Sequence, residues 1–409
     1  MGQSLTEIAE KLKDANKKVQ LIYAFNGTGK TRLSRVFIDS MSSENPETEE
    51  EVDEKIKIMY YNAFTEDLFY WVNTDDEPNL KIHKNEFTDW ILRDRGQDQN
   101  IIDLFQRYTD QKLLPNFVEK NIVVNSGNRQ VNMKTYPEVS FTFNSGDQVY
   151  EDTELAAIKI SKAEESSFVW SVFFALIKEV VTILKDPIGQ REEATFDELQ
   201  YVFIDDPVSS LDDNHLIELA VDIAYLVKTS ASDLKFIITT HNPLFYNVIS
   251  NELNNNIPNP LYIKGEQNTG IERWIYNSDN SLRYRFVKLE DGTFSLYSLG
   301  RKTPFAYHLQ LLREIQTAKD NPSLIKKYHF NFIRNVLEKT ATFLGYSNWE
   351  ELLPIVNGEP DPFANRILNL SSHSAHAGDE IGEVQENDRD KLIEIVNYLE
   401  NHYKFSSLI

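Results

Sequence analysis

The sequence predicts an α/β fold with a parallel sheet core, followed by a mostly α-helical C-terminal domain. Apolar strand-like segments alternate with helical ones up to residue 257, short strands fill 258–304, and the chain is helical from residue 305 onward. Such alternation is typical of a parallel sheet that helices cover on both faces. The length of 409 residues allows two or three domains. We therefore predict a sheet domain over 1–257, a β-rich connector over 258–304 and a helical domain over 305–409.

The elements of the first domain follow from their apolar patterns. Apolar runs predict strands over 18–25, 55–64, 201–205 and 235–240. The same patterns predict helices from about Lys30, over 162–184 and over roughly 213–228. Residues of about 65–158 are helical or mixed, with a helix expected around residues 100–108 and a strand over 139–143. Because sheet elements resume after them, we expect an insertion rather than a separate domain. In the connector, Asp291-Gly292 is typical of a hairpin turn.

The composition is that of an acidic globular chain. A formal net charge of −22 excludes generic coating of nucleic acids, because binding to phosphates depends on clustered Lys and Arg. Residues 301–349, however, hold eight basic against three acidic residues, which suits either a nucleic-acid-binding surface or a solvated helix face. The chain has no cysteine and no long apolar segment, so we expect a cytoplasmic protein without a membrane span.

A phosphate-binding loop follows the first predicted strand. Residues 24–31 read AFNGTGKT, close to the GxxxxGKT pattern, with Ala24 in place of the first glycine. In such a loop the glycines let backbone N–H groups point at phosphates, the lysine reaches the β/γ-phosphates and the threonine hydroxyl binds Mg²⁺. The predicted nucleotide-binding residues here are Asn26, Gly27, Gly29, Lys30 and Thr31. The alternative is an ordinary glycine turn.

Two aspartates end the strand over 201–205. Asp205 is expected to lie beside Thr31 and to hold Mg²⁺ with it, and Asp206 is expected to position the attacking water. The simpler interpretation is an acidic exit from a strand into a turn, since Asp206 precedes Pro207.

Further motifs follow the order found in ATP-binding-cassette (ABC) ATPases. Ser209-Ser210-Leu211-Asp212 resembles their D-loop, His241 resembles their switch histidine, and Ser161 to Ser166 resembles a divergent signature motif. The resemblance implies an ABC-type P-loop NTPase that forms a head-to-tail dimer, with Ser161, Glu165, Asp212 and His241 at the nucleotide. Glu164 and Glu165 replace the usual glycines, so we expect slow turnover or an altered nucleotide preference. Gln97, Gln99 and Gln106 are all candidates for the glutamine loop.

The helical domain contains residues suited to RNA cleavage. Arg334 and Glu338 are one turn apart on a predicted helix, and His373 lies in a later polar segment. A glutamate or histidine can take the proton of a ribose 2′-OH, the histidine can protonate the leaving oxygen, and arginine can stabilise the charge on phosphorus. Arg366 and His376 are neighbours with possible supporting roles. A surface ion pair between Arg334 and Glu338 is the alternative.

Several segments together resemble the PrrC family of bacterial anticodon nucleases. They are IYAFNGTGKTRLSR, YYNAFTEDLFYW, FIDDPVSSLDDNHLIELA, DLKFIITTH, RNxxEKTxxFLGY and SSHS. The resemblance implies cleavage of lysine tRNA beside the wobble base, latency under a type I restriction–modification complex and release on phage infection. It assigns catalysis to Arg334, Glu338 and His373 without a metal at the nuclease site. It also implies ATP or GTP, with dTTP a further candidate, together with Mg²⁺, in a homodimer or higher oligomer in the bacterial cytoplasm.

One segment departs from the family. Residues 297–304, YSLGRKTP, lie where the family is thought to recognise the anticodon, and they contain no acidic residue. The identity of the tRNA is therefore open. The alternative function is a DNA-repair or DNA-end ATPase with a helical interaction domain. A metal-dependent DNA nuclease would need several carboxylates, and residues 305–349 contain few.

Overall fold

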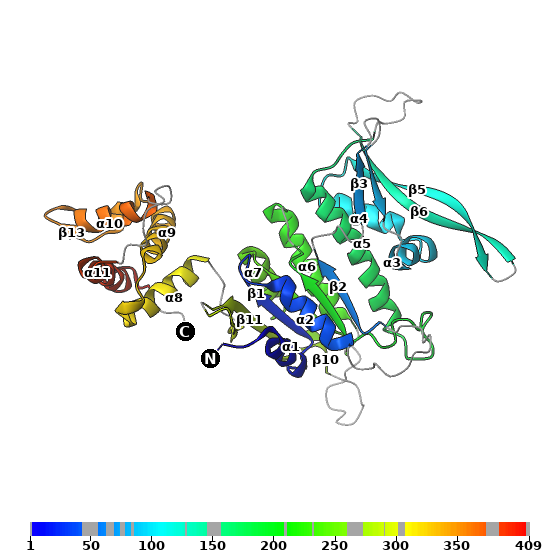
Figure 1. Ribbon diagram of the computed structural model, residues 1–409, viewed down its shortest axis with the longest axis horizontal. Helices are drawn as coiled ribbons and strands as arrows, with labels where there is room; N and C mark the ends of the chain where they lie inside the picture. Colours follow the sequence, from blue (N-terminus) through cyan, green and yellow to red (C-terminus); the bar gives the residue numbers. More distant parts are fainter. Residues whose placement is uncertain are drawn as a thin grey trace. The chain divides into compact units, whose positions relative to one another are not determined.

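The chain forms two compact units, residues Met1–Lys302 and Thr303–Ile409, in a computed structural model (Figure 1). The structure describes residues 2–42, 56–62, 69–73, 78–82, 86–126, 129–144, 157–207, 211–230, 233–259, 273–289, 291–301, 307–373 and 384–405. Each unit has its own hydrophobic core, and each is described by itself below.

A six-stranded sheet forms the centre of the first unit, in the order β12-β11-β1-β8-β7-β2. The strands are β1 (Val19–Tyr23), β2 (Ile58–Asn62), β7 (Tyr201–Asp205), β8 (Lys235–Thr240), β11 (Ser281–Lys288) and β12 (Phe294–Ser298). All neighbouring pairs are parallel except β11 and β12. The predicted parallel core is confirmed, and it brings the carboxyl ends of β1, β8 and β7 to one edge.

Helices cover both faces of this sheet. On one face, α1 (Leu5–Asp14) and α2 (Lys30–Ser42) share a buried cluster with the strands, and the Phe37 ring packs against Tyr201. On the other face, Trp170 of α5 (Lys162–Ile183) packs against Tyr61 of β2. There α7 (Pro243–Glu252) contacts β1 and lies beside α6 (Asp213–Thr229).

Helix α5 is the most apolar helix of the first unit. By length and composition it could cross a membrane, but 78% of its apolar window is buried inside the protein. Its buried residues include Phe168, Trp170 and Phe174, so this helix belongs to the core of the unit.

The predicted connector over 258–304 needs a correction, because most of its strands belong to the main sheet. β11 pairs in parallel with β1, and its hairpin partner β12 lies at the sheet edge. The side chains of Tyr284, Phe286 and Phe294 join the core cluster of α1 and α2, and this burial holds the strands there. The hairpin turn is confirmed, with Gly292 at φ +83°. Among the described residues of this segment, β9 (Ile257–Pro258) and β10 (Trp274–Tyr276) form a separate ribbon.

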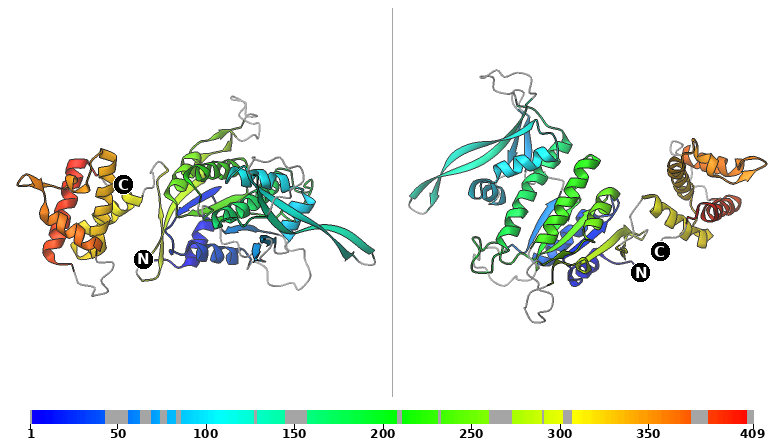
Figure 2. Two further views of the ribbon diagram at one scale, coloured as in Figure 1. Left: turned by 90° about the horizontal axis from the view of Figure 1, so that it is seen from above. Right: turned by 180° about the vertical axis from the view of Figure 1, so that it is seen from behind.

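The insertion is built more from strands than from helices. Its antiparallel sheet has the order β3-β4-β6-β5, with β3 (Phe69–Asn73), β4 (Pro78–Ile82), β5 (Leu113–Ser126) and β6 (Arg129–Phe143). The long β5–β6 ribbon extends beyond the rest of the unit (Figures 1 and 2). Helix α3 (Glu86–Asp89), a π-helical turn (Trp90–Asp94) and α4 (Asp98–Arg107) lie between β4 and β5. The expected helix around residues 100–108 is confirmed by α4, and the expected strand over 139–143 is confirmed by β6. The pairing of β6 with β5 in a long ribbon was not predicted.

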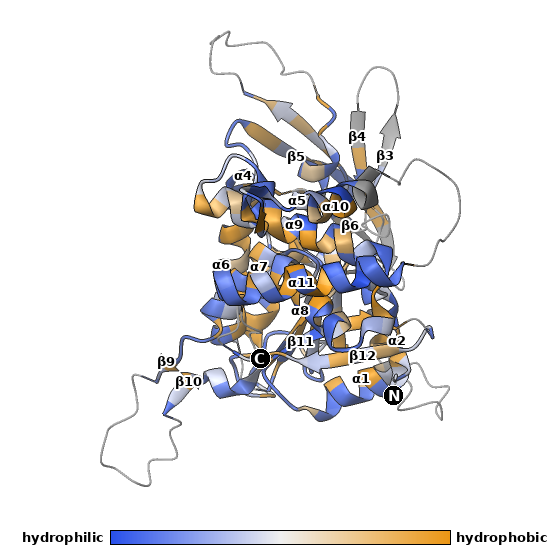
Figure 3. Ribbon diagram, turned by 90° about the vertical axis from the view of Figure 1, so that its left-hand side faces the viewer, coloured by the Kyte–Doolittle hydropathy of each residue, from blue (hydrophilic) through white to orange (hydrophobic). Residues whose placement is uncertain are grey.

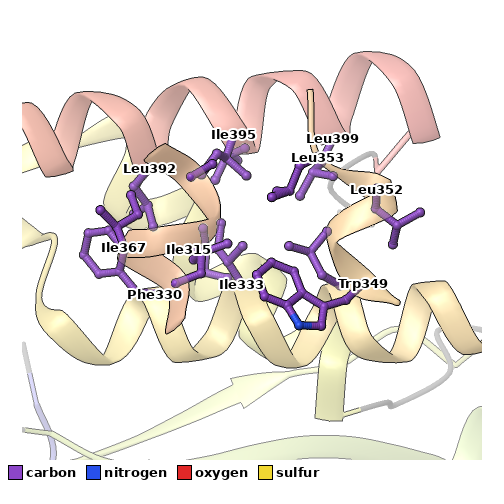
Figure 4. Close-up of a cluster of buried hydrophobic side chains, with 14 of the residues drawn as sticks. Ile315, Phe330, Ile333, Trp349, Leu352, Leu353, Ile367, Leu392, Ile395 and Leu399 are labelled. Atoms are coloured by element: carbon purple, nitrogen blue, oxygen red, sulfur yellow. The ribbon is translucent and has the colours of Figure 1, made fainter. Parts of the chain in front are cut away.

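The second unit is a helical bundle. It consists of α8 (Tyr307–Asp320), α9 (Lys327–Leu344), α10 (Pro362–His373) and α11 (Glu386–Tyr403). Gly345 ends α9 at φ +77°, and a short turn (Trp349–Leu352) and the small hairpin of β13 (Ile355–Val356) and β14 (Glu359–Pro360) lead to α10. Both polar and apolar positions occur along α11 (Figure 3). Its apolar positions meet those of the other helices in a core that includes Phe330, Ile333 and Leu392 (Figure 4).

A buried ion pair joins α10 to α11. The Asp361 carboxylate, 4% exposed, accepts from the N–H of Phe363 at 2.9 Å and lies 2.5 Å from Lys391 Nζ. Burial opposes ionisation of Asp361, but the hydrogen bonds from Lys391 and Ala364 outweigh it and lower the pKa of this carboxyl. A lowered carboxyl pKa stabilises the fold above the ordinary pKa, and that contribution is lost as pH falls through the folded-state pKa.

Replacement of Lys391 by methionine is expected to lower the free energy of unfolding of the helical unit by about 1–3 kcal/mol, because a buried carboxylate loses its cation. The loss should shrink as the pH falls through the folded-state pKa of Asp361. The loss of free energy of unfolding is measured by guanidinium denaturation followed by circular dichroism. The matched control is Glu394→Gln, which removes the exposed partner of the same lysine and should cost less than about 1 kcal/mol. Equal losses in the two variants would contradict the role given to Asp361.

Candidate functional site

The phosphate-binding loop lies at the carboxyl edge of the main sheet. It follows β1, and the N–H of Ala24 donates to the Thr240 carbonyl at the end of β8. Gly27 and Gly29 have φ of +78° and +109°, a backbone region that residues with a Cβ rarely adopt. Lys30 begins α2 directly after this turn. The prediction of a strand, a glycine turn and a helix in this order is confirmed.

The Lys30 ammonium is held by three acceptors. Its Nζ lies 3.2 Å from Asn26 Oδ1, 3.3 Å from the Ala24 carbonyl and 3.2 Å from Asp206 Oδ2. Because residue 24 contributes a backbone carbonyl, an alanine there serves as well as the glycine of the usual pattern. The departure at Ala24 therefore leaves the lysine in place.

Asp205, at the end of β7, connects β8 to α2. Its Oδ2 accepts from Thr31 Oγ1 at 2.7 Å, and its Oδ1 accepts from Thr239 Oγ1 at 2.6 Å. Burial raises the pKa of Asp205, although the two threonine hydrogen bonds act against this shift. A hydroxyl and a carboxylate side by side are oxygen ligands of the kind that Mg²⁺ prefers. This confirms that Asp205 lies next to Thr31.

Asp206 joins the lysine to His241. His241 Nδ1 lies 2.6 Å from Asp206 Oδ2, the same oxygen that meets Lys30. Burial opposes ionisation of Asp206, but the His241 hydrogen bond and the Lys30 charge together lower its pKa. Asp206 has φ +54°, a conformation that costs about 1–3 kcal/mol outside glycine and concentrates at functional sites. The backbone is thus bent where the carboxylate must meet both partners.

Two members of this cluster were absent from the sequence prediction. The Tyr60 hydroxyl donates to Asp205 Oδ2 at 3.4 Å and accepts from Ser34 at 3.1 Å. Burial raises the pKa of Tyr60 to about 12, so it is a neutral donor at physiological pH. Thr239 is the second member of the cluster that the sequence did not predict. Both lie on strands next to β7, and only the order of the strands in the sheet brings them to Asp205.

These side chains fit a nucleotide with Mg²⁺. Lys30 and the glycine turn would hold the phosphates, and Thr31 with Asp205 would hold the cation, which supplies charge stabilisation to phosphoryl transfer. Asp206 and His241 lie beside the lysine, where a proton acceptor for water is needed.

Three predicted nucleotide-binding residues have local roles within the chain. Ser161 Oγ accepts from the N–H of Glu164, and Glu164 accepts from the N–H of Ser161, so the pair caps α5. Glu165 is buried and pairs with Lys162 at 3.0 Å. Asp212 caps α6 by accepting from two backbone N–H groups. Ser209 and Ser210 lie outside the described residues. A role of Ser161, Glu165 and Asp212 across a dimer stays a prediction.

The second unit contains a polar cluster between α9 and α10. Arg334 Nε donates to Glu338 Oε1 at 2.8 Å, and Arg334 NH1 donates to Asn369 Oδ1 at 2.9 Å. The guanidinium lies 5.5 Å from the centre of the Trp349 ring, and Asn365 Oδ1 accepts from the Asn369 amide. The guanidinium is thus held on an edge by two side chains and on a face by a ring.

His373 is the last residue of α10, one helical turn beyond Asn369. Because residues four apart share a helix face, Asn365 and Asn369 lie together, and Asn369 contacts Arg334. The Arg366 guanidinium lies over the Phe363 ring, at 5.0 Å, and His376 lies outside the described residues. Asn369 and Trp349 were not predicted, although the four-residue spacing from His373 was a signal for Asn369.

A family model and known proteins are similar to this chain. The AAA domain family model matches residues 181–399. A curated relative from Escherichia coli, "Anticodon nuclease", is 43% identical over 99% of this chain and 98% of its own length.

Two solved structures are also similar over part of the fold. An SMC head domain from Thermotoga maritima covers 69% of this chain and 90% of its own, at 10% identity and a TM-score of 0.26. An Smc head domain with coiled coil from Pyrococcus yayanosii covers 54% of this chain and 29% of its own, at 14% identity and a TM-score of 0.27.

The 43% identity extends over 99% of the chain and therefore over both units. The chain belongs to the anticodon nuclease family.

Proposed function

We propose that this protein is a nucleotide-gated nuclease that cleaves lysine tRNA in its anticodon loop, without a metal at the nuclease site. The observation that carries the proposal is the Arg334 guanidinium, held between Glu338 and Asn369 and seated on Trp349. A surface ion pair alone would not need a second helix and an aromatic ring to fix the cation. The family membership supports tRNA as the substrate.

The chemistry follows from these side chains. Glu338 takes the proton of the ribose 2′-OH, and the 2′-oxygen then attacks phosphorus and forms the 2′,3′-cyclic phosphate. The bond from phosphorus to the 5′-oxygen breaks as His373 gives that oxygen a proton. Arg334 stabilises the negative charge that develops on the phosphoryl oxygens. One proton leaves the 2′-oxygen and another reaches the 5′-oxygen, so the step is balanced.

The first unit gates this activity in the proposal. The cluster of Lys30, Asp205 and Asp206 is built to bind a nucleoside triphosphate with Mg²⁺, and ATP, GTP and dTTP are its candidates. Two copies of the chain would close on the nucleotide head to tail, with Ser161, Glu165 and Asp212 of one copy facing the phosphates held by the other.

The proposed biological role is antiviral defence in the bacterial cytoplasm. The nuclease would stay latent in a type I restriction–modification complex and act as a toxin once phage infection releases it. Both the latency and the role rest on the resemblance of the sequence motifs.

Mapping of RNA ends tests the activity. Cells that express the wild-type chain should accumulate lysine tRNA cut in the anticodon loop with 2′,3′-cyclic phosphate ends, whereas His373→Ala should leave it intact. Lys30→Ala should abolish nucleotide-dependent regulation while the nuclease residues remain in place. Intact anticodon loops under wild-type expression, with nucleotide supplied, would count against the nuclease and favour an ATPase that acts on DNA ends.

A further inference from the structure

A basic pocket lies at the end of the main sheet opposite the phosphate-binding loop. Strands β1 and β8 begin there, at Val19 and Lys235, and end at the loop. The pocket has a volume of about 680 Å³ and is lined by Lys17, Lys18, Lys235, Arg273 and Trp274, with Asp233 as the one carboxylate among its described lining residues. Four cations against one carboxylate stand out in a chain of net charge −22.

Carbonyl groups and aromatic rings orient these basic side chains. Lys17 Nζ donates to the Asp279 carbonyl at 3.0 Å, and Lys18 Nζ donates to the Ser230 carbonyl at 3.4 Å. The other two lie against rings, Lys235 at 5.2 Å from the centre of the Tyr201 ring and Arg273 at 4.9 Å from that of Trp274. Carbonyls and aromatic faces orient a cation without cancelling its charge, whereas Asp233 interacts with the charge of Lys18. The three other basic side chains therefore supply most of the positive potential in the pocket.

Desolvation makes the charge of Lys18 responsive to a ligand. Burial lowers the pKa of Lys18 to about 7, although the charge of Asp233 acts against the shift. An anion in the pocket would favour the charged amine, so binding of an anion and protonation of Lys18 support each other.

We infer that this pocket binds the phosphate backbone of single-stranded RNA, with Trp274 as a stacking surface for a base. The inference rests on the proposed function, in which RNA is the substrate. Three separated chain segments supply the cations, around residues 17, 235 and 273, and Arg273 is exposed at the rim. Several basic side chains in one pocket with a half-buried aromatic ring suit phosphates and one base. A free nucleotide is the competing ligand.

Salt-dependent binding of RNA tests this site. The probe is a fluorescent anticodon stem-loop of lysine tRNA, and the protein is the full chain with His373→Ala, so that the RNA stays intact. Adding Lys17→Gln and Lys235→Gln should reduce the slope of log K against log salt by about one per lysine. Trp274→Ala should weaken binding about 5- to 100-fold, and Trp274→Phe should retain most of the affinity.

A matched pair controls for net charge. Lys178→Gln with Lys185→Gln removes the same charge from exposed positions outside the pocket and should leave the slope close to that of the parent. An equal loss in this pair, or an unchanged slope in the pocket variant, would overturn the inference. So would a pocket variant that loses affinity for ATP and keeps affinity for RNA.

These experiments distinguish a failure of the pocket inference from a failure of the proposed nuclease function. Cleavage by the wild-type chain together with unchanged RNA binding by the pocket variants would overturn the pocket alone. Weakened RNA binding by the pocket variants without cleavage by the wild-type chain would overturn the proposed nuclease and support the pocket.

Discussion

Arg334→Ala is expected to slow tRNA cleavage about 10²- to 10³-fold in single-turnover assays, the usual cost of removing a donor aimed at developing charge. The fold should survive, because Arg334 and Glu338 are 24% and 46% exposed and an exposed pair contributes little stability. Arg334→Lys should rescue little. A lysine ammonium lacks the planar fork that meets Glu338 and Asn369 while stacking on Trp349. A rate close to that of the wild type in Arg334→Ala would exclude this cluster as the nuclease site.

Variants of Asn369 test whether this residue acts by positioning the Arg334 guanidinium. Asn369→Leu leaves the guanidinium in place but removes its acceptor on α10, so the cleavage rate should fall by less than in Arg334→Ala. Asn369→Asp restores an acceptor and should recover part of the rate. If the leucine and aspartate variants were equally impaired, Asn369 would be acting through packing rather than through its hydrogen bond.

Asp205→Asn is expected to reduce Mg²⁺-dependent nucleotide hydrolysis about 10²- to 10³-fold. The change keeps the size of the side chain but removes the charge that, with Thr31, would hold the cation. Steady-state phosphate release measures it. Asp103→Asn is the matched control, because Asp103 is a carboxylate on α4 that accepts from Gln99. Similar hydrolysis rates in wild type and Asp205→Asn would refute the assigned cation ligand.

The same variant should not destabilise the first unit. Because burial raises the pKa of Asp205, the folded state binds a proton more tightly than the unfolded state. Ionisation of this carboxyl therefore costs folding free energy as the pH rises through the interval between the two pKa values. Asparagine avoids that cost, so thermal unfolding at neutral pH should shift upward or stay unchanged. Mg²⁺ with nucleotide should raise the unfolding temperature of the wild type more than that of the variant.

Local sequence patterns were sufficient to predict an element wherever the residues of that element alone show the pattern. The strand over 201–205, the buried helix over 162–184 and the glycine turn before Lys30 were predicted within a few residues, because periodicity and turn chemistry are properties of neighbouring residues. The prediction failed where pairing partners lie far apart. β11 and β12 were assigned to a connector, since only the parallel pairing with β1 shows that they complete the main sheet. In the insertion, the strand over 139–143 was predicted, but its pairing with β5 in a long ribbon was not.

The candidate sites also combine features that local sequence patterns predict with contacts that only the fold reveals. The sequence by itself determined which residue types are present and in what order, including Lys30, Asp205, Arg334 and Glu338, because motifs and four-residue helical spacing are local. Only the tertiary structure decided that Tyr60 and Thr239 meet Asp205, that Asn369 and Trp349 hold Arg334, and that four cations surround one pocket. The physical reason is that these contacts depend on strand order and on helix packing, which bring together side chains that chain spacing leaves far apart.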